Sequence, residues 1–242
     1  MQLLFFKQGL VLPKGAGKEI TMIALASGSI TPMLLFSSFN FIPSGTATVF
    51  HFIYPAATVL GGVFVLKDKV RRGTLICIVI CTLGISLFYN PGDPINPVGS
   101  ALALTSGLTY AAYILLLSHF HYRQVTGFKF SFYICTISAV VMFAVCVATK
   151  QLRLPTKASV WVTATIFALV LGVGATVFFQ KGTFIIGGQR ASILSTFEPI
   201  TSLIVGFLAF DEAVGVRTII GSSLVILASI LIAVFDAKNA NE

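Results

Sequence analysis

Long apolar runs, separated by short polar breaks, follow one another along nearly the whole chain. The runs are continuously apolar rather than alternating, and each is longer than the roughly 10 residues of a membrane-barrel strand. Because about 20 apolar residues are enough for a helix to cross a bilayer, the pattern predicts an all-α polytopic membrane protein. We expect eight transmembrane helices, over residues 19–41, 44–66, 72–89, 97–119, 129–149, 159–184, 190–210 and 215–235.

The composition narrows the class of protein further. Only 10% of the 242 residues are charged and 56% are hydrophobic, whereas soluble domains carry about 25% charged residues. A soluble enzyme, a disordered tail and a nucleic-acid binder are therefore excluded as default classes of protein. We expect the chain to lie in the lipid bilayer. The net charge of +8 does not change this, because lysine and arginine lie between the apolar runs and form no basic face.

The positive residues predict how the chain is oriented in the membrane, because cytoplasmic loops are enriched in lysine and arginine. Counted on alternate sides of the eight helices, the richer side receives Lys7, Lys14, Lys18, residues 67–72, Arg123, Lys129, Arg190 and Lys238. The poorer side receives Lys150, Arg153, Lys157 and Arg217. We therefore expect a multi-pass protein of the plasma or inner membrane whose C-terminal tail, residues 236–242, is cytoplasmic.

Residue types that carry catalytic or metal chemistry are not arranged for it. The sequence has no phosphate-binding glycine loop, no nucleophile elbow and no cluster of His, Cys and Asp at ligand spacing. The cysteines lie inside apolar runs, where we expect small buried hydrophobic side chains: Cys77, Cys81, Cys135 and Cys146. We expect neither an enzyme nor a bound metal or cofactor.

One stripe of side chains occurs twice. At helical spacing, the second predicted helix carries small and polar residues that recur 144 positions later in the seventh. The first copy consists of Ala47, His51, Tyr54, Pro55, Thr58 and Gly62, and the second of Ala191, Ser195, Glu198, Pro199, Ser202 and Gly206. The same offset relates Gly28 to Gly172 and Asp68 to Glu212, which indicates an internal duplication.

The helix count makes this duplication an inverted one. Equivalent helices are five crossings apart, and an odd number of crossings reverses their direction through the bilayer. Inverted repeats of this kind are a common construction of secondary transporters. Residues 97–235 form a complete repeat of five helices, whereas residues 1–89 hold three, so the first two helices of the first repeat would precede Met1.

Three stretches of the chain resemble a known transporter family. Two of them are Gly45–Pro55 (GTATVFHFIYP) and Arg190–Ile200 (RASILSTFEPI), each followed at a helix end by an acidic residue, Asp68 or Glu212. Together with Leu108–Tyr113 (LTYAAY), they resemble the EamA-type proteins of the drug/metabolite transporter superfamily. The resemblance implies ten helices in two five-helix repeats, both termini in the cytoplasm, and export or exchange of small metabolites. Two of those ten helices are lacking here.

The candidate site residues are polar groups inside the predicted helices, where such groups usually face a partner or a cavity. Glu198 is the one acidic residue well inside a predicted helix, and it suits a contact with a substrate amine or a proton relay. The alternative is a structural carboxyl bonded across helices. If the repeats face each other, His51, Tyr54, Ser195 and Glu198 would line one central cavity. The alternative for His51 is a packed histidine bonded to a carbonyl or a serine.

Two prolines and two tyrosines complete this set. Pro55 and Pro199 lie mid-helix and leave the carbonyl four residues earlier without a helical donor, so we expect each to kink its helix. Tyr110 and Tyr113 are one turn apart and would form an aromatic wall for a planar or cationic substrate. The alternative is that both rings face lipid or the core.

These features predict a secondary transporter of small metabolites, an amino acid or a related solute, that exports its substrate by alternating access. Its expected partners are the bilayer, the small-molecule substrate and protons, which would be coupled through Glu198 or His51. A homodimer is left open. The alternative function is that of a truncated, non-transporting membrane subunit that needs a partner to complete the helix bundle.

Overall fold

The fold is built from helices. The computed structural model describes residues 11–67, 72–87, 89, 96–122, 124, 125, 127–152, 154–195, 197, 198, 201, 204, 208 and 215–240. In chain order the helices are α2 (Ala16–Ala24), η1 (Leu25–Ile30), α3 (Thr31–Ser38), α4 (Ser44–His51), α5 (Tyr54–Phe64), α6 (Arg72–Ser86), α7 (Pro97–Ser118), α8 (Phe128–Ala148), α9 (Ala158–Phe167), η2 (Ala168–Ala175), α10 (Thr176–Ile186), α11 (Gly188–Leu194) and α13 (Val216–Ala240). The segments η1 and η2 are π-helices, which are wound more widely than α-helices.

Several helices have the length and apolar character of membrane spans. Within the described residues, four stretches are long enough to cross a bilayer: Ala16–Ser38, Thr46–Phe64, Pro97–Ser118 and Phe128–Ala148. Shorter apolar helices cover Arg72–Ser86, Ala158–Val170 and Ile219–Ala228. A polytopic helical membrane protein is therefore supported, and the count of eight helices stays a prediction. The helix expected over 190–210 is described as α11 and at a few later positions, so much of it lies outside the described residues.

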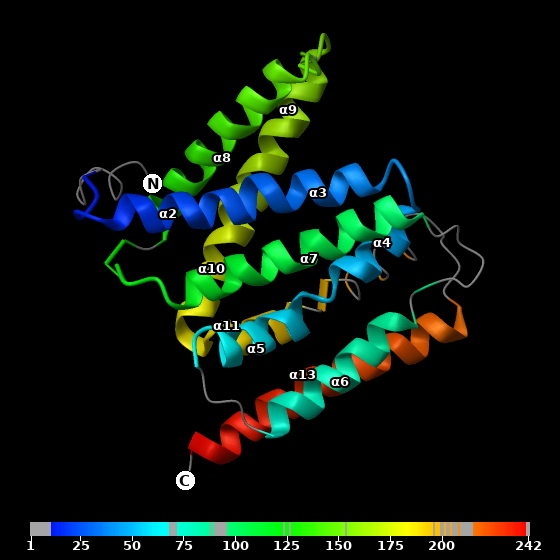
Figure 1. The fold of residues 1–242 in the computed structure, drawn as a ribbon. Coiled ribbons are helices and arrows are strands. Elements are labelled where there is room, and N and C mark those ends of the chain that lie inside the picture. Colours follow the sequence, from blue (N-terminus) through cyan, green and yellow to red (C-terminus); the bar gives the residue numbers. More distant parts are fainter. Residues whose placement is uncertain are drawn as a thin grey trace.

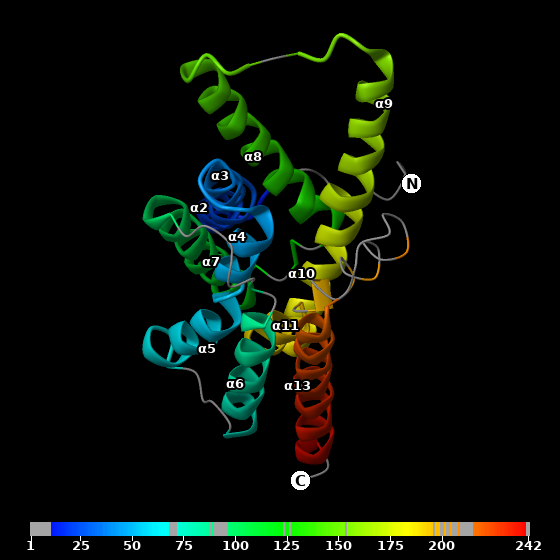
Figure 2. The same cartoon turned by 90° about the vertical axis from the view of Figure 1, so that its right-hand side faces the viewer.

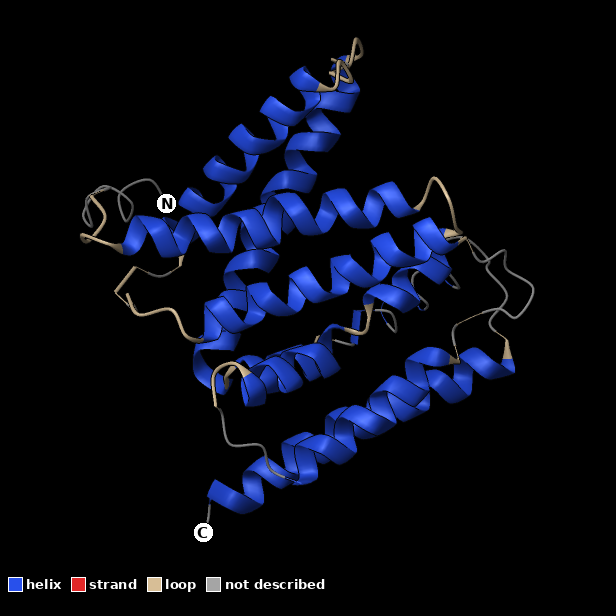
Figure 3. Ribbon diagram, viewed as in Figure 1, coloured by secondary structure: helices blue, strands red, loops and turns tan. Residues whose placement is uncertain are grey.

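The helices form a central group flanked by two helix pairs (Figures 1 and 2). α2, η1 and α3 follow one another as one long rod that lies against α7, and α4 and α5 also pack on α7. α8 and α9 both project from this group and diverge toward the segment that joins them (Figure 2), with α8 packed on α2 and η1. On the other side, α6 and α13 lie along each other and run antiparallel. Figure 3 shows the loops that join these helices.

Element boundaries recur at the offset found in the sequence. α4 and α11 begin at Ser44 and Gly188, which are 144 residues apart. Shifted by the same offset, η1 falls within η2. The opposite directions of α6 and α13 are those that an inverted repeat requires (Figure 1). These observations support the duplication, and its inverted five-helix form stays a prediction.

α8 supplies hydrogen bonds to both π-helices. A π-turn disturbs the regular pairing of backbone carbonyls, and an unpaired carbonyl is costly in lipid. Ser138 donates its hydroxyl to the Ala24 carbonyl at 3.2 Å, at the start of η1. One turn earlier, the Cys135 thiol donates to the Gly172 carbonyl of η2 at 3.6 Å. Cys135 is exposed, so the expectation that the cysteines are buried is wrong for this residue.

The α6–α13 pair depends on a close approach at Gly84. A Cβ atom at this position would lie 2.8 Å from the Gly221 carbonyl oxygen and 3.0 Å from the Leu224 Cβ atom. Neither atom can give way unless the α13 backbone moves. Small residues let membrane helices approach closely, and at Gly84 the lack of space leaves room for glycine alone.

We predict that Gly84→Ala destabilises the protein, because the added methyl group must push α13 away. Overpacking of this kind typically costs about 1–3 kcal/mol. Gly182→Ala is a matched control, because Gly182 lies inside α10 with open space around it. Replacing a helical glycine there should stabilise the protein by about 0.5–1 kcal/mol. The thermal midpoints of the two purified variants should shift in opposite directions, and equal shifts would contradict the close approach.

Candidate functional site

A helix break positions the site. α4 ends at His51 and α5 begins at Tyr54 with Pro55 in its second position, so the expected kink takes the form of a two-residue break. Because proline has no N–H, the His51 carbonyl lacks its helical donor. Gly107 of α7 lies directly against that carbonyl, where any side chain would overlap its oxygen. The break therefore brings α7 into backbone contact with the turn that carries His51 and Tyr54.

His51 is bonded to a serine of α7. Its Nδ1 lies 2.8 Å from Ser106 Oγ, and Ser106 donates its own hydroxyl to the Ala103 carbonyl at 2.6 Å. Since a serine has a single hydroxyl proton, Ser106 accepts from the ring, and the neutral His51 carries its proton on Nδ1. Nε2 is then the acceptor of the ring. This bond matches the alternative interpretation of His51 from the sequence, a packed histidine bonded to a serine.

Tyr54 makes the corresponding bond to the second half of the chain. Its hydroxyl lies 2.7 Å from the Oγ of Ser195, the residue that caps the end of α11. Ser195 donates to the Ser192 carbonyl at 2.9 Å, so its oxygen accepts from the phenol of Tyr54. Tyr54 is only 1% exposed. A buried hydroxyl without this acceptor would be destabilising, so the bond holds α5 and α11 in register.

Five rings meet at this point and form what we call the aromatic cluster: His51, Tyr54, Tyr110, Tyr113 and Phe179. The Tyr110 ring is central, with centroid distances of 4.8 Å to Tyr54, 5.5 Å to His51 and to Tyr113, and 6.3 Å to Phe179. Tyr113 is 4% exposed, so its ring is packed inside the protein and does not face lipid. The rings fill the space between α5, α7 and α10.

Glu198 lies beside the aromatic cluster. Its side chain is exposed, and its carboxylate has no hydrogen-bond or ion-pair partner within the described part of the chain. Its backbone N–H bonds to the Ser195 carbonyl at 3.0 Å. The carboxylate is close enough to act electrostatically on the hydroxyls of Tyr54 and Tyr110. Pro199, where the second kink is expected, lies outside the described residues.

Three residues that the sequence analysis did not single out complete the surroundings. Ser106 was detectable, because it lies one turn before Tyr110 on the same helical face. Gln180 was detectable as a lone amide inside an apolar run; it is fully buried, its Oε1 accepts from Ser131 at 3.0 Å, and its amide lies next to the Tyr113 hydroxyl. Phe179 carried no signal, since nothing distinguishes it among 22 phenylalanines.

We predict that the Tyr54–Ser195 bond is measurable as a coupling energy. Ser195→Ala leaves the buried Tyr54 hydroxyl without an acceptor, which should cost about 1–3 kcal/mol in the free energy of unfolding. In Tyr54→Phe/Ser195→Ala the unpaired hydroxyl is gone, so the double variant should lose less than the sum of the single losses, by about 1 kcal/mol. Chemical unfolding of the four proteins in detergent measures this cycle, and additive losses would contradict the bond.

Known transporter proteins are similar to this chain in sequence. A model of the EamA-like transporter family matches residues 1–90 and 97–234. A Helicobacter pylori protein named an uncharacterized transporter is 25% identical over 229 residues, which cover 91% of this chain and 75% of that protein. A Salmonella typhimurium protein named the uncharacterized inner membrane transporter YicL is 26% identical over 208 residues, covering 81% of this chain and 66% of that protein.

One solved structure shares the fold. That crystal structure is 17% identical in sequence to this chain. The two superpose with a TM-score of 0.73 over 95% of this chain and 79% of the other. The sequence stretches around His51 and Glu198 already resemble EamA-type proteins. Because the family model covers most of the chain, the protein belongs to the EamA-like transporter family.

Proposed function

We propose that this protein is a secondary transporter that exports a small metabolite, an amino acid or a related solute, by alternating access. Membership of a transporter family supports transport in general. The observation that carries the proposal is the contact between Tyr54 and Ser195, 2.7 Å apart, at the broken ends of helices from the two halves of the chain. Secondary transporters place their substrate sites at such interrupted helices between repeats.

The contacts between the halves are suited to exchange with a substrate. Neutral side-chain hydrogen bonds of 2.7–2.8 Å join the halves at this level, namely Thr31 with Thr109, His51 with Ser106, and Tyr54 with Ser195. A neutral hydrogen bond contributes a net stabilisation of only about 0.5–1.5 kcal/mol. Substrate groups that offer the same donors and acceptors can therefore replace these bonds as one half rocks against the other.

The groups around the cluster favour an amino acid as the substrate. The faces of tyrosine and phenylalanine rings attract cations such as an ammonium group, and the Glu198 carboxylate beside them would pair with the same group. The buried Gln180 amide, beside the Tyr113 hydroxyl, has N–H donors that would suit a carboxylate. A solute that carries both an ammonium and a carboxylate group matches this arrangement.

The positive residues support one orientation in the membrane. The start of α2 and the ends of α5, α7 and α13 lie at the same end of the molecule (Figure 1). This end carries the exposed Lys14, Lys18 and Lys67, and the rule that positive loops stay inside assigns it to the cytoplasm together with the C-terminus. The Salmonella relative is named an inner membrane transporter, which supports the cell membrane as the location.

Two neighbouring phenylalanines give a matched test of the site. Phe179 lies 6.0 Å from Tyr113 between ring centroids, whereas Phe178 is 77% exposed. Aromatic contacts contribute about 0.5–1.5 kcal/mol, so Phe179→Ala should raise the KM for substrate about two- to tenfold. Phe178→Ala should leave KM unchanged. Counterflow in proteoliposomes against a panel of amino acids measures the KM of both variants. Equal KM values would show that the substrate does not bind at the aromatic cluster.

Proton coupling through Glu198 has a test of its own. Glu198→Gln should abolish the dependence of transport on a pH gradient while leaving counterflow at equal pH, because exchange of bound substrate needs no net proton movement. Glu19→Gln is the matched control, since Glu19 lies outside the cluster and pairs with His121. A pH-gradient dependence that survives Glu198→Gln would show that another group couples the proton.

A further inference from the structure

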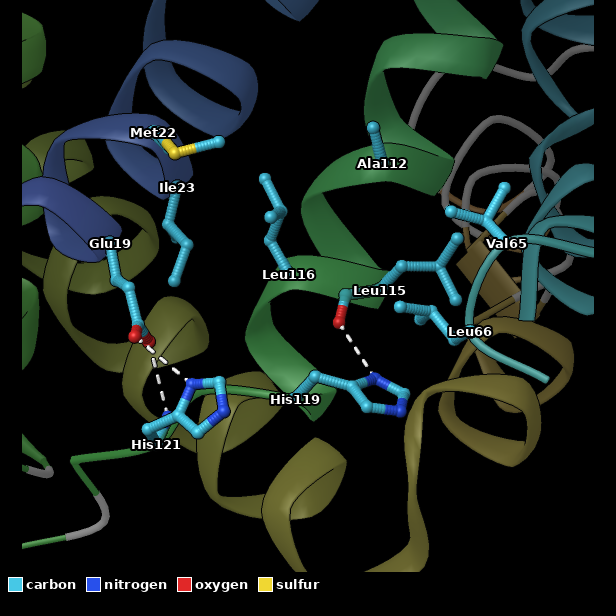
Figure 4. Close-up of a pocket in the computed structure, with 10 residues that line it drawn as sticks. All are labelled: Glu19, Met22, Ile23, Val65, Leu66, Ala112, Leu115, Leu116, His119 and His121. Carbon is cyan, nitrogen blue, oxygen red and sulfur yellow. Dashed lines mark hydrogen bonds and ion pairs between the residues drawn. The ribbon is translucent and has the colours of Figure 1, made fainter. Parts of the chain in front are cut away.

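A groove of about 480 Å³ opens between three helix ends, and its lining shares no residue with the aromatic cluster (Figure 4). Most of its lining is apolar: Met22 and Ile23 on α2, Ala112, Leu115 and Leu116 on α7, and Val65 and Leu66 after the end of α5. In Figure 4, Leu116 lies between the α2 side chains and those that follow α5. Such walls fit a hydrocarbon chain and offer almost nothing to a polar solute.

The polar residues of the groove lie together at one of its ends. Figure 4 shows Glu19, His119 and His121 gathered at the same side of the apolar side chains. His121 donates to Glu19 twice, from its ring Nδ1 at 3.0 Å and from its backbone N–H at 3.1 Å. Both carboxylate oxygens of Glu19 are therefore engaged in hydrogen bonds.

The remaining charge around this polar end is positive. Exposed lysines flank the groove, because Lys67 directly follows Leu66 and Lys18 directly precedes Glu19. α2 begins at this level and α5 and α7 end at it, so this level corresponds to the surface of the bilayer. Apolar walls below and positive side chains at the surface complement a molecule with a hydrocarbon tail and an anionic head.

We infer that the groove binds an anionic phospholipid, with one acyl chain between α2, α5 and α7 and its phosphate beside Lys18 and Lys67. The site is separate from the aromatic cluster, and a lipid there would tie the start of α2, in the first half, to the end of α7, in the second. A lipid bound there contacts both halves at once, so its occupancy would favour the arrangement in which these ends lie together.

Native mass spectrometry of the full chain, with phosphatidylglycerol or phosphatidylcholine added, tests this site. The wild type should retain one phosphatidylglycerol in preference to phosphatidylcholine. Ala112→Trp should fill the groove and lose that lipid. Ala101→Trp is the matched control, because Ala101 is an exposed alanine of the same helix that does not line the groove.

A second pair of variants tests the headgroup without touching the packing. Lys67→Gln should lower the preference for phosphatidylglycerol roughly fivefold, the effect expected of one lysine near an anionic surface. Lys150→Gln is its control, because Lys150 is equally exposed, shares the left-handed backbone conformation (φ 56° against 58°) and follows the far end of α8. It should change nothing.

Several outcomes would overturn the proposal. Equal retention of the two lipids by the wild type would show that the groove does not select an anionic headgroup. Unchanged lipid binding in Ala112→Trp would place the lipid elsewhere. The same spectra report mass, so a dimer that Ala112→Trp converts to a monomer without loss of lipid would make the groove an interface between copies of the chain instead.

Discussion

A bilayer offers the backbone no hydrogen-bond partner, and this constraint governs each departure from regular α-helix that the structure describes. At the break between α4 and α5, the orphaned carbonyl of His51 is covered by α7 at Gly107. At η1 and η2, Ser138 and Cys135 of α8 donate to backbone carbonyls. The break and η1 belong to the first half, whereas α7 and α8 belong to the second. The irregular backbone of the first half is therefore covered by helices of the second half, whereas η2 is covered by α8 of its own half.

The same constraint determines the chemistry of the site. Ser106 and Ser195 each donate to a carbonyl three residues back in the chain, and each then accepts from a side chain of the first half. A serine used in this way has no proton left to give, so its partner must be a donor. The bonds thus fix the proton of neutral His51 on Nδ1 and the direction of the Tyr54 hydroxyl. What the site can offer to a ligand follows from these two serines.

Helical periodicity predicts the features of the fold that depend on the sequence of a single helix. The apolar runs predicted the spans around Ala16–Ser38 and Pro97–Ser118, and the 144-residue offset anticipated that α4 and α11 begin at equivalent positions. Periodicity assigns residues to a face without saying which neighbour that face meets. Nothing in the sequence therefore showed that Gly107 covers the His51 carbonyl. The sequence did not indicate the π-helices either, because the hydrogen bonds that pair their carbonyls come from side chains of another helix, α8.

The strength of the links between the halves bears on the proposed motion. A buried ion pair at the cluster would cost several kcal/mol to separate, because each charge would be left buried without its partner. The links described at the cluster are instead neutral hydrogen bonds, such as that of Tyr54 with Ser195, while the pair of Glu19 and His121 lies at an exposed end. A few neutral bonds of about 1 kcal/mol each amount to less than the roughly 4–8 kcal/mol released by a ligand that binds with millimolar to micromolar affinity. A substrate of ordinary affinity would therefore have enough binding energy to exchange these bonds for its own contacts, with a wider margin than a buried ion pair would leave.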